Sequence, residues 1–140
     1  DIVLPRDHVV VREVREDAEV TVCSGSAFPG DGIAVDIGPE TRTRFQAILS
    51  EARTVVWNGP MGISEMAPFA EGTNAIAQAI AHAPATSVVG GGDSVAALRK
   101  SGFLPFINHV RTGGGASLQF LEGRELPGIE SLRTRQVMEL

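Results

Sequence analysis

The chain is short of several residue types, and each shortage excludes a class of protein. Cys23 is its single cysteine, so it forms no internal disulfide and we expect a reducing, cytoplasmic location. No apolar run approaches the ~20 residues that cross a bilayer, and the start lacks the pattern of a signal peptide. Lys100 is the only lysine among 12 cationic residues, the net charge is −5, and no basic cluster is present. We therefore expect neither nucleic acid nor a membrane as a partner.

What the chain does contain is typical of one folded domain. Hydrophobic residues make up 43% of its 140 residues and charged residues 21%, which is ordinary for a globular protein. A chain of this length buries roughly two-thirds of its unfolded surface, which suffices for a single core. Composition therefore predicts no more than one domain.

A regular alternation of helix and strand signals begins at residue 39. Pro39 suits a first helical position, and the apolar spacing behind it predicts a helix over 39–52. The same signals predict further helices at 69–83, 94–101 and 116–122, and short apolar strands at 54–57, 86–89 and 107–110. Such alternation is typical of the α/β class. It predicts a Rossmann-like parallel sheet with helices on both faces, as part of a three-layer αβα domain.

The two ends of the chain show weaker patterns. Residues 2–4 and 8–11 form short extended runs that a proline separates, and a polar stretch with turn residues follows over 12–32. The tail at 124–140 contains a Pro-Gly turn at 127–128 and no strong periodicity.

Glycine-rich loops follow all three predicted strands, at 58–62, 90–94 and 112–117. In a parallel sheet the carboxyl ends of the strands share one edge, and ligands of open α/β sheets bind there. We therefore expect the three loops to converge on one binding site.

The loop at 90–94 reads Gly-Gly-Gly-Asp-Ser and leads into a helix. Its glycines let a ligand approach the backbone closely, and the N–H groups at the helix start attract phosphate. Asp93 would repel a bare phosphate but not one that carries Mg²⁺, which takes one or two carboxylates together with phosphate oxygens. In the alternative interpretation, Asp93 or Ser94 only caps the helix.

The other two loops offer different chemistry. Three glycines at 113–115 form a run of N–H groups without an acidic side chain, which suits a phosphoryl group in transit; the alternative is a flexible connection. The loop at 58–65 contains an amide, a rigid turn, apolar atoms and a carboxylate, which suit a sugar and a flat base. The alternative for Glu65 is an ordinary solvated surface residue. Neither a Walker P-loop nor a Gly-x-Gly-x-x-Gly fingerprint is present.

In their order along the chain, these loops resemble those of the phosphoglycerate kinases. The matching strings are VDIGP at 35–39, TVVWNGPMG at 54–62, GGGDS at 90–94, TGGGAS at 112–117 and LEGRELPG at 121–128. The match is collinear and spans nearly the whole chain, so it is far more specific than any single glycine run.

The resemblance implies both a fold and an activity. Phosphoglycerate kinases are two-domain, hinge-closing glycolytic monomers that transfer a phosphoryl group between 1,3-bisphosphoglycerate and ADP, giving 3-phosphoglycerate and ATP. Residues 1–140 would form the later part of the C-terminal, nucleotide-binding domain. Within it, 1–38 would be an extended and loop region, 39–123 the repeating helix-strand units, and 124–140 a tail. ADP or ATP would be the ligand, with Mg²⁺ as the cofactor.

The resemblance also implies the site residues. Asp93 would hold Mg²⁺ on the nucleotide phosphates, and Glu65 would bind the ribose. The full set of nucleotide-binding residues would be Ala34, Asn58, Pro60, Gly62, Ile63, Glu65, Gly90, Gly91, Gly92, Asp93 and Ser94. The catalytic residues facing the transferred phosphoryl group would be Gly113, Gly114 and Gly115. Two residues depart from the family pattern: Ser64 stands where a bulky aromatic is usual, and Ala34 where glycine is usual.

Parts of the family's site have no counterpart in this sequence. These are the lysines that grip the nucleotide phosphates, the rest of the adenine pocket, and the basic N-terminal domain that binds 3-phosphoglycerate. We therefore expect the chain alone to be inactive until the N-terminal portion completes it. Two alternatives stay open: a stand-alone module that binds Mg-nucleotide, and a truncated fragment without binding activity.

Overall fold

The computed structural model of the chain describes residues 1–134. The strands in this range are β1 (Asp7–Val11), β2 (Thr21–Ser24), β3 (Ile33–Ile37), β4 (Thr54–Asn58), β5 (Thr86–Gly90) and β6 (His109–Arg111). The α-helices are α1 (Pro39–Ser50), α2 (Glu71–His82), α3 (Gly92–Ser101), α4 (Gly114–Leu121) and α5 (Pro127–Thr134). Short 3-10 turns lie at Gly25–Ala27, Ala67–Phe69 and Leu104–Phe106.

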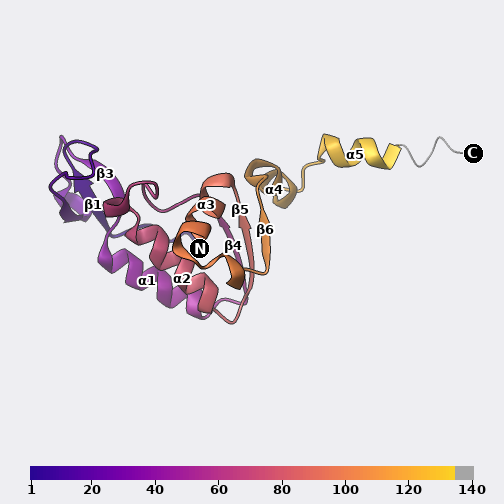
Figure 1. Ribbon diagram of the computed structural model, residues 1–140, viewed down its shortest axis with the longest axis horizontal. Coiled ribbons are helices and arrows are strands. Elements are labelled where there is room, and N and C mark those ends of the chain that lie inside the picture. The colour runs from indigo at the N-terminus through magenta and orange to yellow at the C-terminus, as the bar shows by residue number, and fades with distance from the viewer. Residues whose placement is uncertain (135–140) are drawn as a thin grey trace, which may run out of the picture.

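The strands form two separate three-stranded sheets. β1 lies between β2 and β3 in an antiparallel sheet, and β5 lies between β4 and β6 in a parallel sheet. Figure 1 shows the antiparallel sheet at one end of the domain and the parallel sheet beyond α1 and α2. The predicted α/β class and parallel sheet are confirmed. The antiparallel sheet goes beyond the prediction, which anticipated only the run at 8–11, and residues 2–4 form no strand.

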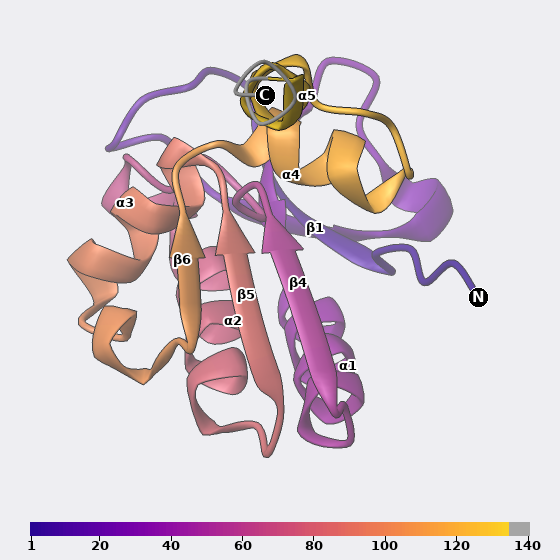
Figure 2. The ribbon, with the colours of Figure 1, turned by 90° about the vertical axis from the view of Figure 1, so that its right-hand side faces the viewer.

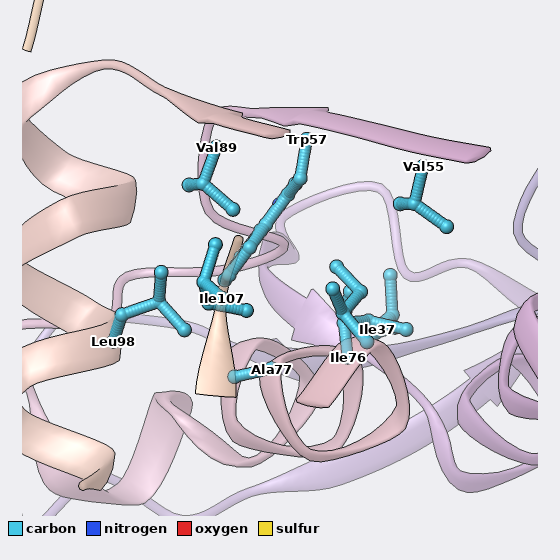
Figure 3. Close-up of a cluster of buried hydrophobic side chains, with 9 residues drawn as sticks. Ile37, Val55, Trp57, Ile76, Ala77, Val89, Leu98 and Ile107 are labelled. Carbon is cyan, nitrogen blue, oxygen red and sulfur yellow. The ribbon is translucent and has the colours of Figure 1, made fainter. Parts of the chain in front are cut away.

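The main core lies between the parallel sheet and the helices behind it. Val55, Trp57 and Val89 point from β4 and β5 towards Ile76 of α2 and Leu98 of α3 (Figure 3). Successive strand residues point to opposite faces of a sheet, so alternate residues of β4 are buried. Each large apolar side chain buried in this way contributes roughly 1.5–3 kcal/mol. This packing holds the strand ends, and therefore the loops that follow them, in fixed positions.

On the opposite face of the parallel sheet α4 lies over the carboxyl end of β5, where a Cβ atom on Gly90 would be 3.6 Å from Gly114 Cα, so helices lie on both faces but cover this one only at its end. Figure 2 looks onto this face, with β4, β5 and β6 in front and α1 and α2 behind. Val56 of β4 is 48% exposed here, and His109 of β6 is exposed as well. Strands that are covered on both faces are buried continuously. The alternating burial of β4 shows a strand that is covered on one face only.

Helix α1 is capped from β1 and not by its own N-cap residue. That residue is Gly38, which has no side chain, and the carboxylate of Asp7 takes its place. This carboxylate accepts hydrogen bonds from the backbone N–H groups of Glu40 (2.9 Å) and Thr41 (2.8 Å) and from the Thr41 hydroxyl (2.6 Å). Burial opposes ionisation, but the hydrogen bonds from Thr41 and Glu40 outweigh it and lower the pKa of Asp7.

Helix α2 is capped in the same way, from β3. Its N-cap residue, Ala70, makes no side-chain cap, and the buried carboxylate of Asp36 accepts hydrogen bonds from the N–H groups of Gly72 (2.6 Å) and Ile37 (2.8 Å). Burial dominates at this position and raises the pKa of Asp36. Both helices behind the parallel sheet are thus joined to the antiparallel sheet through a buried aspartate.

Between residues 39 and 123 every predicted helix and strand is present, with ends within two residues of the prediction. The tail differs. The Pro-Gly pair at 127–128 begins helix α5 instead of a turn, because proline is well suited to the first helical position. α5 lies away from both sheets in Figure 1. Across residues 1–134, none of the helices has the length and apolar character needed to cross a membrane.

Candidate functional site

The three glycine-rich loops begin at one edge of the parallel sheet. In the strand register Asn58 lies beside Gly90, and Gly90 lies beside Arg111, so β4, β5 and β6 end together. Figure 2 shows their carboxyl ends pointing to the same side, next to α4. The prediction that these loops converge is confirmed.

The loops meet through glycine backbone. A Cβ atom on Gly114 would lie 2.9 Å from Gly91 Cα and 2.8 Å from Asn58 Oδ1, closer than real Cβ atoms approach other atoms. Gly91 has a φ of +94°, and a Cβ atom there would lie 2.7 Å from the same Asn58 oxygen. The Gly91 N–H also donates to the carbonyl of Arg111 (3.2 Å). The close approach of the loops therefore requires glycine at both 91 and 114.

Helix α3 begins without a side-chain cap, since its N-cap residue is Gly91. The first N–H groups of a helix have no partner inside it and lie at the positive end of its dipole. Asp93 is exposed in this first turn. Ser94 is completely buried, and its Oγ accepts a hydrogen bond from the Gly59 N–H (2.8 Å). Neither Asp93 nor Ser94 is therefore the N-cap residue of α3, and the Ser94 hydroxyl binds Gly59.

The loop after β4 is held against α2 and β3. The Met61 N–H donates to the Thr73 hydroxyl of α2 (3.1 Å), and the Ile63 N–H donates to the carbonyl of Val35 in β3 (2.9 Å). Gly62 lies between these two contacts, where a Cβ atom would come within 2.6 Å of the Val35 carbonyl oxygen. The loop therefore follows one path between the two sheets.

The far end of the same loop is held by α3. The Lys100 ammonium donates to the backbone carbonyls of Ser64 (3.4 Å) and Glu65 (3.2 Å). Ser64 is buried and Glu65 is exposed. The carboxylate of Glu65 is thus carried by a backbone segment with a defined position.

A cleft of about 260 Å³ lies between β3 and this loop. Ala34, Gly62 and Ile63, three of the predicted nucleotide-binding residues, line it together with Pro5 and His8. The lining is largely apolar, with the imidazole of His8 and the carboxylate of Asp36 as its ionisable groups, and this chemistry suits a flat base.

The third loop leads into α4. Gly113 and Gly115 are exposed, and a Cβ atom on Gly115 would meet nothing within 4 Å. The first turn of α4 contains no acidic residue. The start of α4 therefore offers backbone N–H groups to an anion without a competing carboxylate.

The predicted site residues thus fall into two groups that the loop at 59–65 connects. The first group surrounds the strand ends and comprises Asn58, Gly90, Gly91, Gly92, Asp93, Ser94, Gly113, Gly114 and Gly115. The second follows the loop and the cleft and comprises Ala34, Pro60, Gly62, Ile63 and Glu65.

Sequence reasoning missed two residues that the structure places at the site, His8 in the cleft and Lys100 beneath the loop. No local pattern connects Lys100 with carbonyls 35 and 36 positions earlier in the chain. The only feature of the sequence that singles out Lys100 is that the chain contains no other lysine.

Asp93 is the candidate for a metal at this site. Among residues 1–134, no group of three or more histidine, cysteine, aspartate or glutamate side chains could hold a metal ion. A nucleotide-bound Mg²⁺ does not need such a group, because phosphate oxygens and waters supply most of its ligands. A single exposed carboxylate beside a glycine-rich loop at a helix start fits this requirement.

Comparison with known proteins identifies the family. The profile of the family described as "Phosphoglycerate kinase" matches residues 1–124. The chain belongs to the phosphoglycerate kinase family. The phosphoglycerate kinase of Moorella thermoacetica is 53% identical over 131 residues, which cover 94% of this chain and 33% of the relative. That of Chlorobium chlorochromatii is 54% identical over 134 residues, which cover 94% of this chain and 34% of the relative.

Solved structures of phosphoglycerate kinases share the fold. The enzyme from Coxiella burnetii matches with a TM-score of 0.85 and 44% identity over 91% of this chain and 33% of the other. The enzyme from Pyrococcus horikoshii matches with a TM-score of 0.80 and 38% identity over 92% of this chain and 32% of the other. The chain therefore spans about a third of the length of the phosphoglycerate kinases that it matches.

Proposed function

We propose that this chain forms the nucleotide-binding part of a phosphoglycerate kinase, an enzyme that transfers a phosphoryl group between 1,3-bisphosphoglycerate and ADP. The observation that carries the proposal is the convergence of three glycine-rich loops at the starts of α3 and α4. Phosphate binds well where N–H groups at a helix start face it and where glycines let it approach. Membership of the family supports the same assignment.

The phosphates of ADP or ATP lie, in this proposal, along residues 90–92 and the start of α3. Asp93 holds Mg²⁺, which neutralises charge on the phosphate oxygens when it is bound. Asn58, whose side chain lies between the second and third loops, flanks the phosphate chain. Ser94 is buried, so we assign its hydroxyl the task of holding Gly59 in place.

The base and ribose occupy the other half of the site. The cleft lined by Ala34, Gly62 and Ile63 takes the flat base, with Pro60 beside it. Glu65, exposed at the end of the loop, accepts hydrogen bonds from the ribose hydroxyls.

The glycines before and within the first turn of α4 face the phosphoryl group that is transferred. Phosphoryl transfer depends on positioning and on stabilising charge, and it needs little covalent chemistry from the protein. Gly113 and Gly115 present backbone N–H groups without a nearby carboxylate in that turn, and Gly114, whose own N–H donates to the Thr112 carbonyl (3.0 Å), lets the backbone lie close to the second loop. The N–H groups of Gly113 and Gly115 can therefore stabilise the negative charge that spreads over the group in transit.

The substrate that carries the carboxyl group binds, in this proposal, to the portion of the relatives that the chain does not span. We therefore expect residues 1–140 alone to bind nucleotide weakly and to catalyse no transfer. Mixing them with the remaining portion should restore activity, and the complete enzyme should act as a cytoplasmic monomer.

Calorimetric titration with ADP, with and without Mg²⁺, tests the proposal on the chain itself. We expect binding that Mg²⁺ strengthens, and in Asp93→Asn a loss of about tenfold in affinity that is confined to the Mg²⁺ titration. Asp17→Asn, which changes an exposed carboxylate paired only with a surface arginine, is the matched control. If Asp93→Asn loses the same factor in ADP affinity with and without Mg²⁺, Asp93 does not hold the metal. No ADP binding at millimolar concentration would identify the chain as a fragment without binding activity.

A further inference from the structure

We infer that Lys100 is a positioning residue of the nucleotide site, which holds the Glu65 segment at a fixed place relative to Asp93. The inference rests on the proposed function, because it assigns Lys100 a role through the carboxylate that is proposed to bind ribose. It adds a residue for which the glycine loops and the cleft give no indication.

The contacts of Lys100 are its first support. Its Nζ donates to two consecutive backbone carbonyls, those of Ser64 (3.4 Å) and Glu65 (3.2 Å). An ammonium group has three donors and no acceptor, so two carbonyl oxygens on one turn of the loop match its chemistry. Ser64 is buried, so this part of the loop cannot move outwards without breaking packing as well as hydrogen bonds.

The second support is that α3 holds the loop at both ends. Ser94, in the first turn of α3, accepts the N–H of Gly59 at the start of the loop (2.8 Å). Lys100, in the last turn of the same helix, holds the end of the loop. Asp93 lies in the first turn as well. One rigid helix therefore sets the spacing between the proposed metal-binding carboxylate and the proposed ribose-binding carboxylate.

Helix electrostatics alone do not explain this lysine. A cation in the last turn of a helix is favourable next to the negative end of the dipole, and Arg99 already supplies one in that turn of α3. Lys100 lies at the opposite end of α3 from the glycine loop. It therefore acts on a nucleotide through the Ser64–Glu65 backbone and not by contact with the phosphates.

The test compares two ligands on the full chain, ADP and 2′,3′-dideoxyadenosine diphosphate, by calorimetry with Mg²⁺. The two ligands differ only in the ribose hydroxyls, so the ratio of their affinities reports on the Glu65 carboxylate. In the wild-type chain and in Arg99→Met we expect a preference for ADP of about tenfold. In Lys100→Met we expect this preference to fall to about twofold, with the affinity for the dideoxy ligand nearly unchanged. Lys100→Arg keeps the donors and should restore the preference.

The outcomes separate the inference from the proposed function. If Lys100→Met retains the wild-type preference for ADP, the inference is wrong while the proposed function stands. If the wild-type chain binds neither ligand, or if Glu65→Gln leaves the preference unchanged, the proposed ribose role fails and the inference fails with it. A purely structural role of Lys100 predicts equal losses for both ligands, and that result would also overturn the inference. Because Lys100 is exposed, we expect all variants to unfold in urea at nearly the same midpoint.

Discussion

The contact between the second and third glycine loops can be tested with one added methyl group. Gly114→Ala places a Cβ atom 2.9 Å from Gly91 Cα and 3.0 Å from Gly91 N. Both are backbone atoms, so the contact cannot be relieved by a side-chain rotation. Gly115→Ala, one residue further along α4, adds the same methyl group where nothing lies within 4 Å.

The two substitutions should change stability in opposite directions. Alanine in a helix is favoured over glycine by about 0.5–1 kcal/mol, so Gly115→Ala should stabilise the fold by about that amount. Gly114→Ala receives a similar benefit but also an overpacking cost of about 1–3 kcal/mol, because the loops must separate. The difference between the variants cancels the helix term and leaves the cost of the contact, about 1–3 kcal/mol.

Urea unfolding of the two variants and the wild-type chain measures this difference. For nucleotide binding, Gly114→Ala should lower the affinity for ADP by about tenfold, since separation of the loops moves the phosphate-binding N–H groups. Gly30→Ala, which also has open space around it and lies outside the site, is the control for binding. If Gly114→Ala is as stable as Gly115→Ala and binds ADP like the wild type, the close approach of the loops is refuted.

Three further predictions concern the buried polar groups. Asp7→Ala should lower the free energy of unfolding in urea by about 2–3 kcal/mol, whereas the exposed control Asp31→Ala should lower it by less than about 0.5 kcal/mol. Because the pKa of Asp7 is lowered in the folded state, its contribution to stability is present above the usual pKa of 3.8 and is lost as pH falls through the folded-state value. For Asp36 the dependence of the free energy of unfolding on pH has the opposite sign. Its pKa is raised in the folded state, so its contribution is present below 3.8 and is lost as pH rises through the folded-state value. Asp36→Asn should remove this pH dependence, and an unchanged dependence of stability on pH in that window would contradict the prediction. Ser94→Ala leaves the Gly59 N–H without its acceptor, so it should lower the free energy of unfolding in urea by about 1 kcal/mol and weaken ADP binding severalfold in calorimetry. If the variant keeps both the stability and the ADP affinity of the wild type, Ser94 does not support the loop.

The repeating part of the fold was predictable because its signals are local. Pro39 and the apolar spacing behind it predict α1, and the short apolar runs that end in glycine predict β4 and β5. Convergence of the loops then follows from the geometry of parallel sheets. The antiparallel sheet could not be read in the same way: β2 buries only Cys23, and the first two residues of β3 are exposed.

The residues that the sequence did not reveal act across the fold. Asp7 caps a helix 33 and 34 positions later in the chain, and Lys100 reaches carbonyls 35 and 36 positions earlier. Helix caps are recognised in a sequence by their position next to the helix, and α1 has only Gly38 there. The exposure of alternate residues of β4 was also beyond prediction, because the apolar run at 54–57 does not tell how much of each face a helix covers.

The two aspartate caps have a consequence for the order in which this chain folds. The first turn of α1 depends on Asp7, and the first turn of α2 on Asp36, which is 36 positions from the N–H that it binds. Contacts of such sequence separation gain their energy only after a large loop has closed, and they slow folding in consequence. The first-turn N–H groups of both helices gain these acceptors only when the antiparallel sheet has docked. The two sheets should therefore form and open as a single cooperative unit, and the first-turn amides of both helices should exchange with solvent at a common rate.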